Sequence, residues 1–282
     1  MSLLPTAVFE FLVAPVASGL ALHHAARALG PRRAGLEFGA LAVYGYALER
    51  VAIAAFGSHE YAAGWLVAPG GVPVAVAVCW AAIILSAVAA AQRLGAWSPG
   101  ALAMSAALVG ISLDLLMEPV AVRSGLWRWT PPGPWLGVPV GNFVGWGVIV
   151  GAYVLGAVRL GASGSATRDA ARRLALGGAS ILALWLVGLA WTRLGAERLF
   201  ASGRGFLVAA LVLLALVALS ARGPRQAPAA AELGARLGAA GRPLALLPIA
   251  LAFAWNAFLL RDASLALVAA CVVAVLLRVL AK

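Results

Sequence analysis

Long apolar stretches alternate with short polar breaks along the whole chain. The apolar runs are about 20 residues long, which is enough for an α-helix to cross the ~30 Å hydrocarbon core of a bilayer. We therefore predict an all-α, polytopic transmembrane bundle that forms a single integral membrane domain over residues 1–282. The nine expected helices are at about 7–29, 34–56, 72–93, 100–118, 141–161, 174–194, 204–221, 243–260 and 263–281.

Two positions and one segment define the expected breaks. Pro119 is predicted to end the helix over 100–118, because proline disfavours helical backbone at the residue before it. Asp262 is well placed to cap a helix that begins after it, although a single kinked helix over 243–281 would give eight helices instead of nine. Residues 222–242 are rich in proline, alanine and glycine and are expected to form a mobile cytoplasmic linker without chemistry.

Composition supports a membrane protein and excludes several other classes. The chain is 63% hydrophobic and 11% charged, whereas a soluble domain has about 25% charged residues. The net charge of +11 comes from arginines at predicted helix ends, so we expect the lipid bilayer and not nucleic acid as the partner. Cys79 and Cys271 lie in apolar segments and are interpreted as core thiols. The first helix is expected to be retained, since it is too long for a cleaved signal peptide and ends in a basic loop.

Basic residues predict the orientation of the chain in the cell membrane. With nine helices, the 21 lysines and arginines divide into 14 on one side and 7 on the other. The more basic side should be cytoplasmic, which puts the N-terminus outside and the C-terminus in the cytoplasm.

Carboxylates are distributed unevenly between the two sides. A charged group near the hydrocarbon costs at least ~2.5 kcal/mol on insertion scales, so such a group should be paired or functional. For Glu60, Glu197 and Asp262, simple acidity at loop ends is the preferred interpretation. The residues at or near the predicted outer ends are Glu10, Glu49, Glu60, Asp114, Glu118, Glu197 and Asp262.

A ten-residue pattern occurs twice. Residues 71–80 read GVPVAVAVCW and residues 137–146 read GVPVGNFVGW, and a glutamate, Glu49 or Glu118, precedes each copy at a similar distance. We interpret this as a parallel internal repeat with halves at about 35–93 and 100–161, although chance similarity in valine- and alanine-rich sequence is the alternative. The interface between repeats often holds the substrate site of a membrane protein.

Candidate chemistry is concentrated between residues 114 and 146. Asp114 and Glu118 are four positions apart and therefore share one helix face. Two neighbouring carboxylates resist being charged together, so one of them can remain protonated and act as a general acid. The alternative is an ion pair with Arg123 or Arg128 that holds the following loop in place.

Aromatic side chains surround these carboxylates. Trp127 and Trp129 lie in the loop, and Trp146 lies in the next helix. They fit an interfacial aromatic belt, but beside two carboxylates they also fit a wall for a cation or a long polyene. Asn142 would hold a water, polarise a substrate oxygen or cap its helix. The histidines have no metal-ligand spacing to a carboxylate, so no metal site is predicted.

Two consecutive motifs carry a family resemblance. The pattern D-x-x-x-E-P-x-A-x-x-x-G-x-W-x-W runs from Asp114 to Trp129, and G-V-P-x-x-N-F-x-G-W runs from Gly137 to Trp146. Together they resemble the membrane-embedded carotenoid biosynthesis family that includes the carotenoid 1,2-hydratases and bisanhydrobacterioruberin hydratase. The likeness is strong over these motifs and extends loosely over residues 35–160.

The resemblance implies a hydro-lyase that adds water to the terminal isoprenoid double bond of an acyclic carotenoid, with no cofactor. Asp114 would protonate the alkene, Glu118 would hold the water or share the proton, and Asn142 would position the water. Contacts with the substrate and its tertiary cation are expected from Trp127, Trp129, Trp146, Phe143, Arg123 and Glu49.

Other functions remain open at this point. The small membrane lycopene cyclases also protonate a carotenoid end group, but the segment after Pro139 here lacks their acidic pair. A transporter would also suit parallel repeats, although the carboxylates gather near one face instead of the middle of the bilayer. A non-catalytic carotenoid-binding subunit is a third class. The sequence does not define the carotenoid, the number of ends modified or the oligomeric state.

Overall fold

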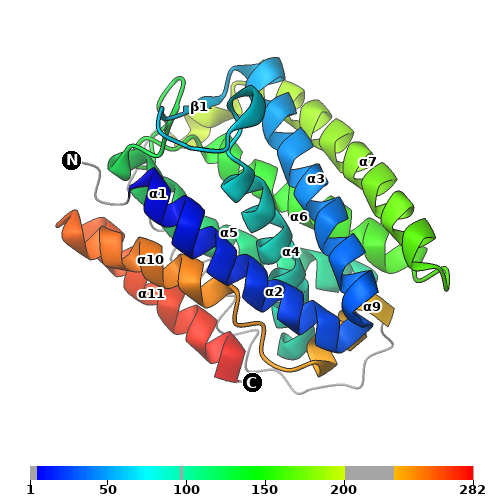
Figure 1. Cartoon of the computed structure of the whole chain (residues 1–282). Helices are drawn as coiled ribbons and strands as arrows, with labels where there is room; N and C mark the ends of the chain where they lie inside the picture. The colour runs from blue at the N-terminus through cyan, green and yellow to red at the C-terminus, as the bar shows by residue number, and fades with distance from the viewer. Residues whose placement is uncertain (1–4, 96–97, 201–231, 282) are drawn as a thin grey trace.

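The computed structural model describes residues 5–95, 98–200 and 232–281, and their regular structure is almost entirely helical (Figure 1). Within these ranges, seven helical stretches are long and apolar enough to cross a membrane, and the apolar helix Leu246–Leu259 is shorter. The predicted all-α, multi-pass bundle is therefore confirmed. The helix expected at 204–221 lies outside the described residues.

Among the described residues, the longest connections between helices, 57–73 and 125–139, each contain a short strand. The first span consists of α1 (Thr6–Val8), the π-helical segment η1 (Phe9–Val13) and α2 (Ala14–Leu29). The next five are α3 (Pro31–Phe56), α4 (Val74–Leu94), α5 (Pro99–Ser124), α6 (Val140–Leu160) and α7 (Ala166–Arg193). The C-terminal helices are α9 (Glu232–Ala239), α10 (Leu246–Leu259) and α11 (Ala263–Ala281). The short elements are β1 (His59–Tyr61), η2 (Pro69–Gly71), β2 (Trp127–Trp129) and η3 (Ala196–Phe200).

Helix α4 lies at the centre of the bundle and packs against α2, α3, α5 and α9 (Figure 1). Its most apolar window is 83% buried, compared with 11% for α7, which contacts α3 and α6 at the periphery. Small side chains explain this close packing, because they allow helix backbones to approach one another without a hydrophobic driving force in lipid. Ala81, Ala82, Ala87, Ala89, Ala90 and Ala91 are all fully buried.

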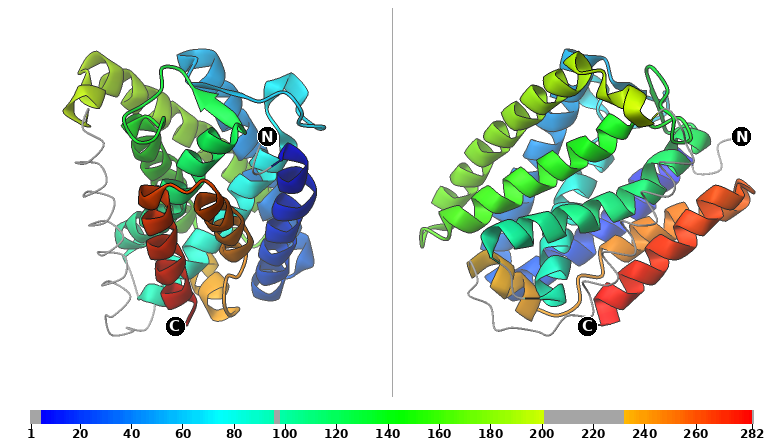
Figure 2. Two further views of the ribbon diagram at one scale, coloured as in Figure 1. Left: turned by 90° about the vertical axis from the view of Figure 1, so that its left-hand side faces the viewer. Right: turned by 180° about the vertical axis from the view of Figure 1, so that it is seen from behind.

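Helices α10 and α11 form a hairpin that packs against α5 (Figure 2). Oδ1 of Asp262 accepts hydrogen bonds from the backbone N–H groups of Ser264 (2.9 Å) and Leu265 (3.2 Å), so it caps α11. Two helices are therefore present between 243 and 281, and the alternative of one kinked helix is wrong.

Helix α5 continues beyond Pro119, so the prediction that this proline ends the helix is wrong. The helix ends at Gly125, whose φ of 72° is left-handed. The N–H of Leu126 bonds to the carbonyl of Ala121 and the N–H of Gly125 bonds to the carbonyl of Val122, which forms a Schellman cap. Proline removes one backbone donor, which a buried membrane helix tolerates when its neighbours hold it in place.

Two predicted boundaries on the side of the bundle opposite β1 also need correction. Helix α7 begins at Ala166, earlier than the expected 174, because its polar first turns pair with α3. Arg33 contacts Asp169 at 2.6 Å, and Arg173 contacts Glu37 at 3.3 Å with both side chains almost fully buried.

The second correction concerns the expected linker over 222–242. Residues 222–231 lie outside the described residues, but Glu232–Ala239 forms the helix α9 within the segment expected to be a linker. Leu237 of α9 is fully buried, and its carbonyl lies 2.9 Å from Nε2 of His24. Burial of this leucine against α2 and α4 explains why this part of the segment is helical.

Carboxylates near the β1 end stabilise loops and helix starts. Both oxygens of Glu10 accept backbone N–H groups, from Leu66 and Val67, at 2.8 Å. Glu197 accepts the first N–H groups of α6, from Val140 (2.6 Å) and Gly141 (3.0 Å), where the helix dipole favours a negative charge. These two acidic residues therefore have a clear structural role.

Candidate active site

A two-stranded ribbon joins the loops that follow α3 and α5. β1 and β2 pair antiparallel, and alternate residues of each strand face opposite sides. Glu60 and Arg128 form an exposed ion pair on the outer side. The residues on the inner side are His59, Tyr61, Trp127 and Trp129, with His59 opposite Trp129 and Tyr61 opposite Trp127. The ribbon therefore places four aromatic rings beside the ends of the two helices.

Glu118 of α5 is held by the tryptophans of this ribbon. Its Oε2 accepts hydrogen bonds from Nε1 of Trp127 and Nε1 of Trp129, both at 2.9 Å. Its Oε1 has no hydrogen-bond partner among the described residues. The carboxyl group is therefore fixed through one oxygen, while the other is available to a ligand.

Asp114 lies one helical turn before Glu118 and is fully buried. Its Oδ2 accepts a hydrogen bond of 2.8 Å from Nδ2 of Asn142, and its Oδ1 has no partner in the described part of the chain. Pro139 is the N-cap residue of α6, so the alternative that the Asn142 side chain caps this helix is wrong. The amide is instead oriented by Asp114.

Neither carboxyl group forms an ion pair with arginine in the described ranges. Arg128 pairs with Glu60, and the half-exposed Arg123 lies 3.8 Å from Asp262. The alternative in which these arginines hold Asp114 or Glu118 is therefore wrong.

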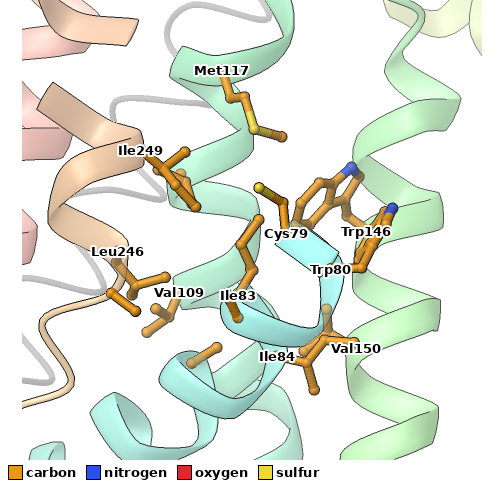
Figure 3. Packing of buried hydrophobic residues seen from close by; sticks show 14 of the residues in the cluster. Cys79, Trp80, Ile83, Ile84, Val109, Met117, Trp146, Val150, Leu246 and Ile249 are labelled. Atoms are coloured by element: carbon orange, nitrogen blue, oxygen red, sulfur yellow. The ribbon is translucent and has the colours of Figure 1, made fainter. Parts of the chain in front are cut away.

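The two copies of the ten-residue pattern meet at a pair of indole rings. Helix α4 starts directly after Pro73 and α6 directly after Pro139, so the terminal tryptophans of the two copies occupy equivalent positions. The rings of Trp80 and Trp146 have centroids 4.1 Å apart and planes inclined by 30° (Figure 3). Nε1 of Trp80 also donates a hydrogen bond of 2.7 Å to Oε1 of Glu49.

His59 is a polar residue of the site to which the sequence analysis gave no role. Its Nε2 lies 3.0 Å from Oε2 of Glu49, and its Nδ1 lies 2.9 Å from Oγ of Ser58. Burial alone lowers the pKa of His59, but the hydrogen bond and negative charge of Glu49 outweigh it and raise the pKa above its usual value. The repeat contained the signal, since His59 follows Glu49 at nearly the spacing at which Trp127 follows Glu118.

These groups surround one cavity of about 520 Å³, a size typical of sites for small molecules. Apolar residues of α3 and α7, including Phe56, Leu184 and Val187, complete the wall. Its polar and aromatic lining residues include Glu49, His59, Trp80, Glu118, Trp127, Trp129, Asn142 and Trp146. The cavity is thus an aromatic chamber whose wall includes the carboxyl groups of Glu49, Glu118 and Glu197.

Three residues predicted for the site lie elsewhere. Asp114, Phe143 and Arg123 are not among the described residues that line the cavity. Asp114 reaches it through Asn142, Phe143 is buried in the helical core, and Arg123 is on the surface. The described ranges also contain no group of three or more His, Cys, Asp or Glu side chains arranged to hold a metal ion.

Comparison with known proteins gives one match. A family model described as carotenoid biosynthesis protein matches residues 8–222, which include every residue that lines the cavity. No curated protein and no solved structure matches the chain.

Proposed function

We propose that this chain, which belongs to the carotenoid biosynthesis protein family, hydrates the terminal isoprenoid double bond of an acyclic carotenoid. Such a reaction requires a proton donor, an enclosure that tolerates a carbocation, and a water held on one face of the alkene. The observation that carries the proposal is the carboxyl group of Glu118 in the wall of an aromatic cavity, with Asn142 beside it.

The reaction adds one water and changes no oxidation state overall. The acid O–H bond breaks and its proton bonds to the CH carbon of the terminal alkene, which leaves a tertiary cation on the neighbouring carbon. The oxygen of water bonds to that carbon, and the resulting oxonium loses one proton. The product is a tertiary alcohol, and the lost proton regenerates the acid.

We assign proton donation to Glu118 and not to Asp114, which the sequence analysis favoured. Glu118 lines the cavity and has one oxygen without a partner, whereas Asp114 contacts Asn142 and does not line it. Asp114 is therefore a positioning residue. By fixing Nδ2 of Asn142, it leaves the amide oxygen as the acceptor for a hydrogen bond from water.

The aromatic walls suit the intermediate. Indole faces attract cations, and the interaction is worth about 2 kcal/mol or more when the pair is desolvated. Trp80, Trp146 and Trp129 contribute such rings to the cavity. The apolar residues of α3 and α7 would accommodate the adjoining part of the polyene.

Expression in a lycopene-producing bacterial host tests this function. Pigments from cells grown in H₂¹⁸O are expected to include a product one water heavier that carries the labelled oxygen. Glu118→Gln should abolish it, while Glu60→Gln, a matched change at the exposed carboxylate on β1, should retain it. An isomer of unchanged mass with altered absorption would indicate cyclisation, and an unchanged pigment profile would contradict hydration of lycopene.

A further inference from the structure

Hydration involves two proton transfers, and Glu118 accounts for the first. The second is the loss of a proton from water as its oxygen bonds to the cation. A group that accepts this proton must reach the same cavity and must be ionised when the water attacks. Among the described residues that line the cavity, Glu49 and His59 are candidates that the donor step does not use.

Glu49 is held in place through both carboxylate oxygens. Oε1 accepts the indole N–H of Trp80 at 2.7 Å, and Oε2 lies 3.0 Å from Nε2 of His59. The Glu49 residue is 8% exposed and His59 is 7% exposed, and both line the cavity. A carboxylate in contact with a protonated histidine is stabilised in its ionised form.

Both ring nitrogens of His59 lie within hydrogen-bonding distance of an oxygen. Nδ1 is 2.9 Å from Oγ of Ser58, which in turn lies 3.2 Å from the carbonyl of Ala52, and Nε2 is 3.0 Å from Oε2 of Glu49. When the ring is protonated, both nitrogens donate, and Nε2 forms an ion pair with the ionised Glu49 in the cavity wall. The hydrogen bond and negative charge of Glu49 outweigh burial and raise the pKa of His59, which favours this charged form.

The two repeat halves give their glutamates different surroundings. In the second half, Glu118 is held by the neutral indoles of Trp127 and Trp129. In the first half, the strand position that corresponds to Trp127 is occupied by His59, which supplies a cation. Two related carboxyl groups on one cavity thus differ in charge environment, which is how acid and base roles are separated in other enzymes.

We propose that Glu49, ionised by its pairing with His59, is the general base that removes a proton from water as the water captures the cation. This role rests on the proposed hydratase function. The O–H bond of water breaks, a new O–H bond forms on Glu49, and the C–O bond forms on the tertiary carbon. Glu49 then releases this proton to solvent water and Glu118 takes one up, which restores the starting state of both carboxyl groups. His59 does not contact the reacting atoms and acts as a positioning residue through Glu49.

Deuterium incorporation separates the two steps. Membranes that contain the full chain are incubated with lycopene in D₂O, and both hydrated and recovered pigments are analysed by mass spectrometry. In Glu49→Gln, the donor still forms the cation, but water capture is slow and the cation returns to an alkene by losing a proton. Hydrate should fall by about 10²-fold, as is typical for loss of an acid–base group, while recovered lycopene gains deuterium.

His59→Gln retains a side-chain N–H for Glu49 but has no charge. Like Glu49→Gln, this variant should form less hydrate and leave more deuterium in the recovered lycopene. Ser58→Ala leaves both Glu49 and His59 in place and should give a smaller shift. His23→Gln, a matched change on the exposed face of α2, should leave both the amount of hydrate and the deuterium content of recovered lycopene unchanged.

Each outcome decides one statement. If Glu49→Gln loses hydrate and gains no deuterium while its thermal unfolding matches wild type, the base assignment is wrong. If Glu49→Gln forms as much hydrate as wild type, the base assignment is also wrong. If Glu118→Gln still incorporates deuterium, the donor assignment fails instead. If wild type forms no hydrate from lycopene, the proposed function fails for this substrate.

Discussion

The indole rings of Trp80 and Trp146 lie with centroids 4.1 Å apart and planes tilted by 30°, although they come from separate copies of the ten-residue pattern. Trp80 also binds Glu49, and the wall formed by the two rings faces the cavity that contains Glu118. This ring contact therefore joins α4 and α6 at the wall of the cavity where the proposed chemistry takes place.

Replacing Trp146 tests whether the aromatic wall of the cavity stabilises the carbocation. Trp146→Phe retains an aromatic face and should lower the rate of hydration less than Trp146→Leu, which removes it. Loss of about 2 kcal/mol of cation stabilisation corresponds to more than a tenfold decrease in rate. The rates of wild type, Trp146→Phe and Trp146→Leu are compared as initial rates of hydrate formation in isolated membranes. Equal rates for the two variants would show that ring volume, and not the aromatic face, is what matters.

The indole donors to Glu118 can be removed one at a time. Trp127→Phe and Trp129→Phe each delete one N–H donor to Oε2, and a hydrogen bond to a charged group contributes about 1.5–3 kcal/mol. We expect each variant to lose at least about tenfold in rate, and the double variant to lose more. Trp185→Phe on the exposed face of α7 is the matched control and should have wild-type activity. A double variant as active as either single one would mean that the two indoles act as a unit.

Stability should depend on pH through His59. Because Glu49 raises the pKa of His59 in the folded state above 6.5, this group stabilises the fold fully below its unfolded pKa. That contribution to stability is lost as the pH rises through the higher pKa that His59 has in the folded state. The difference in Tm between wild type and His59→Gln in detergent should therefore be largest at acidic pH and shrink toward alkaline pH. A difference that grows with pH would contradict the ion pair.

The buried pair of Glu37 and Arg173 provides a stability test away from the cavity. Arg173→Met leaves a buried carboxylate without its partner and should destabilise the protein by about 3–5 kcal/mol. Adding Glu37→Leu removes the uncompensated charge and should restore most of that loss. Thermal unfolding of the single and double variants measures the coupling. If the double variant is no more stable than Arg173→Met, the contact does not connect α3 and α7 energetically.

The end of α5 depends on one glycine. Gly125 has a φ of 72°, and a side chain in this left-handed region costs about 1–2 kcal/mol. Gly125→Ala should therefore lower Tm. Gly100→Ala, in the first turn of the same helix with no atom near the added methyl group, should not. Equal Tm values would indicate that the turn relaxes without strain.

The sequence by itself determined the membrane class and the main spans, because long apolar runs and a scarcity of charge reflect the thickness and polarity of the bilayer. It also identified the family, since the motif that carries the resemblance depends on local spacing. It failed at Pro119 and at the start of α7, where contacts with other helices decide whether helical backbone continues.

Tertiary structure alone decided which residues face the cavity. Asp114 and Glu118 share one helix face, yet Asn142 covers the first and the ribbon tryptophans hold the second. His59 became a site residue because antiparallel pairing of β1 with β2 places it against Glu49 and Trp129. Contacts between segments far apart in the chain depend on packing and hydrogen bonding in three dimensions, which the spacing of residues along one segment does not encode.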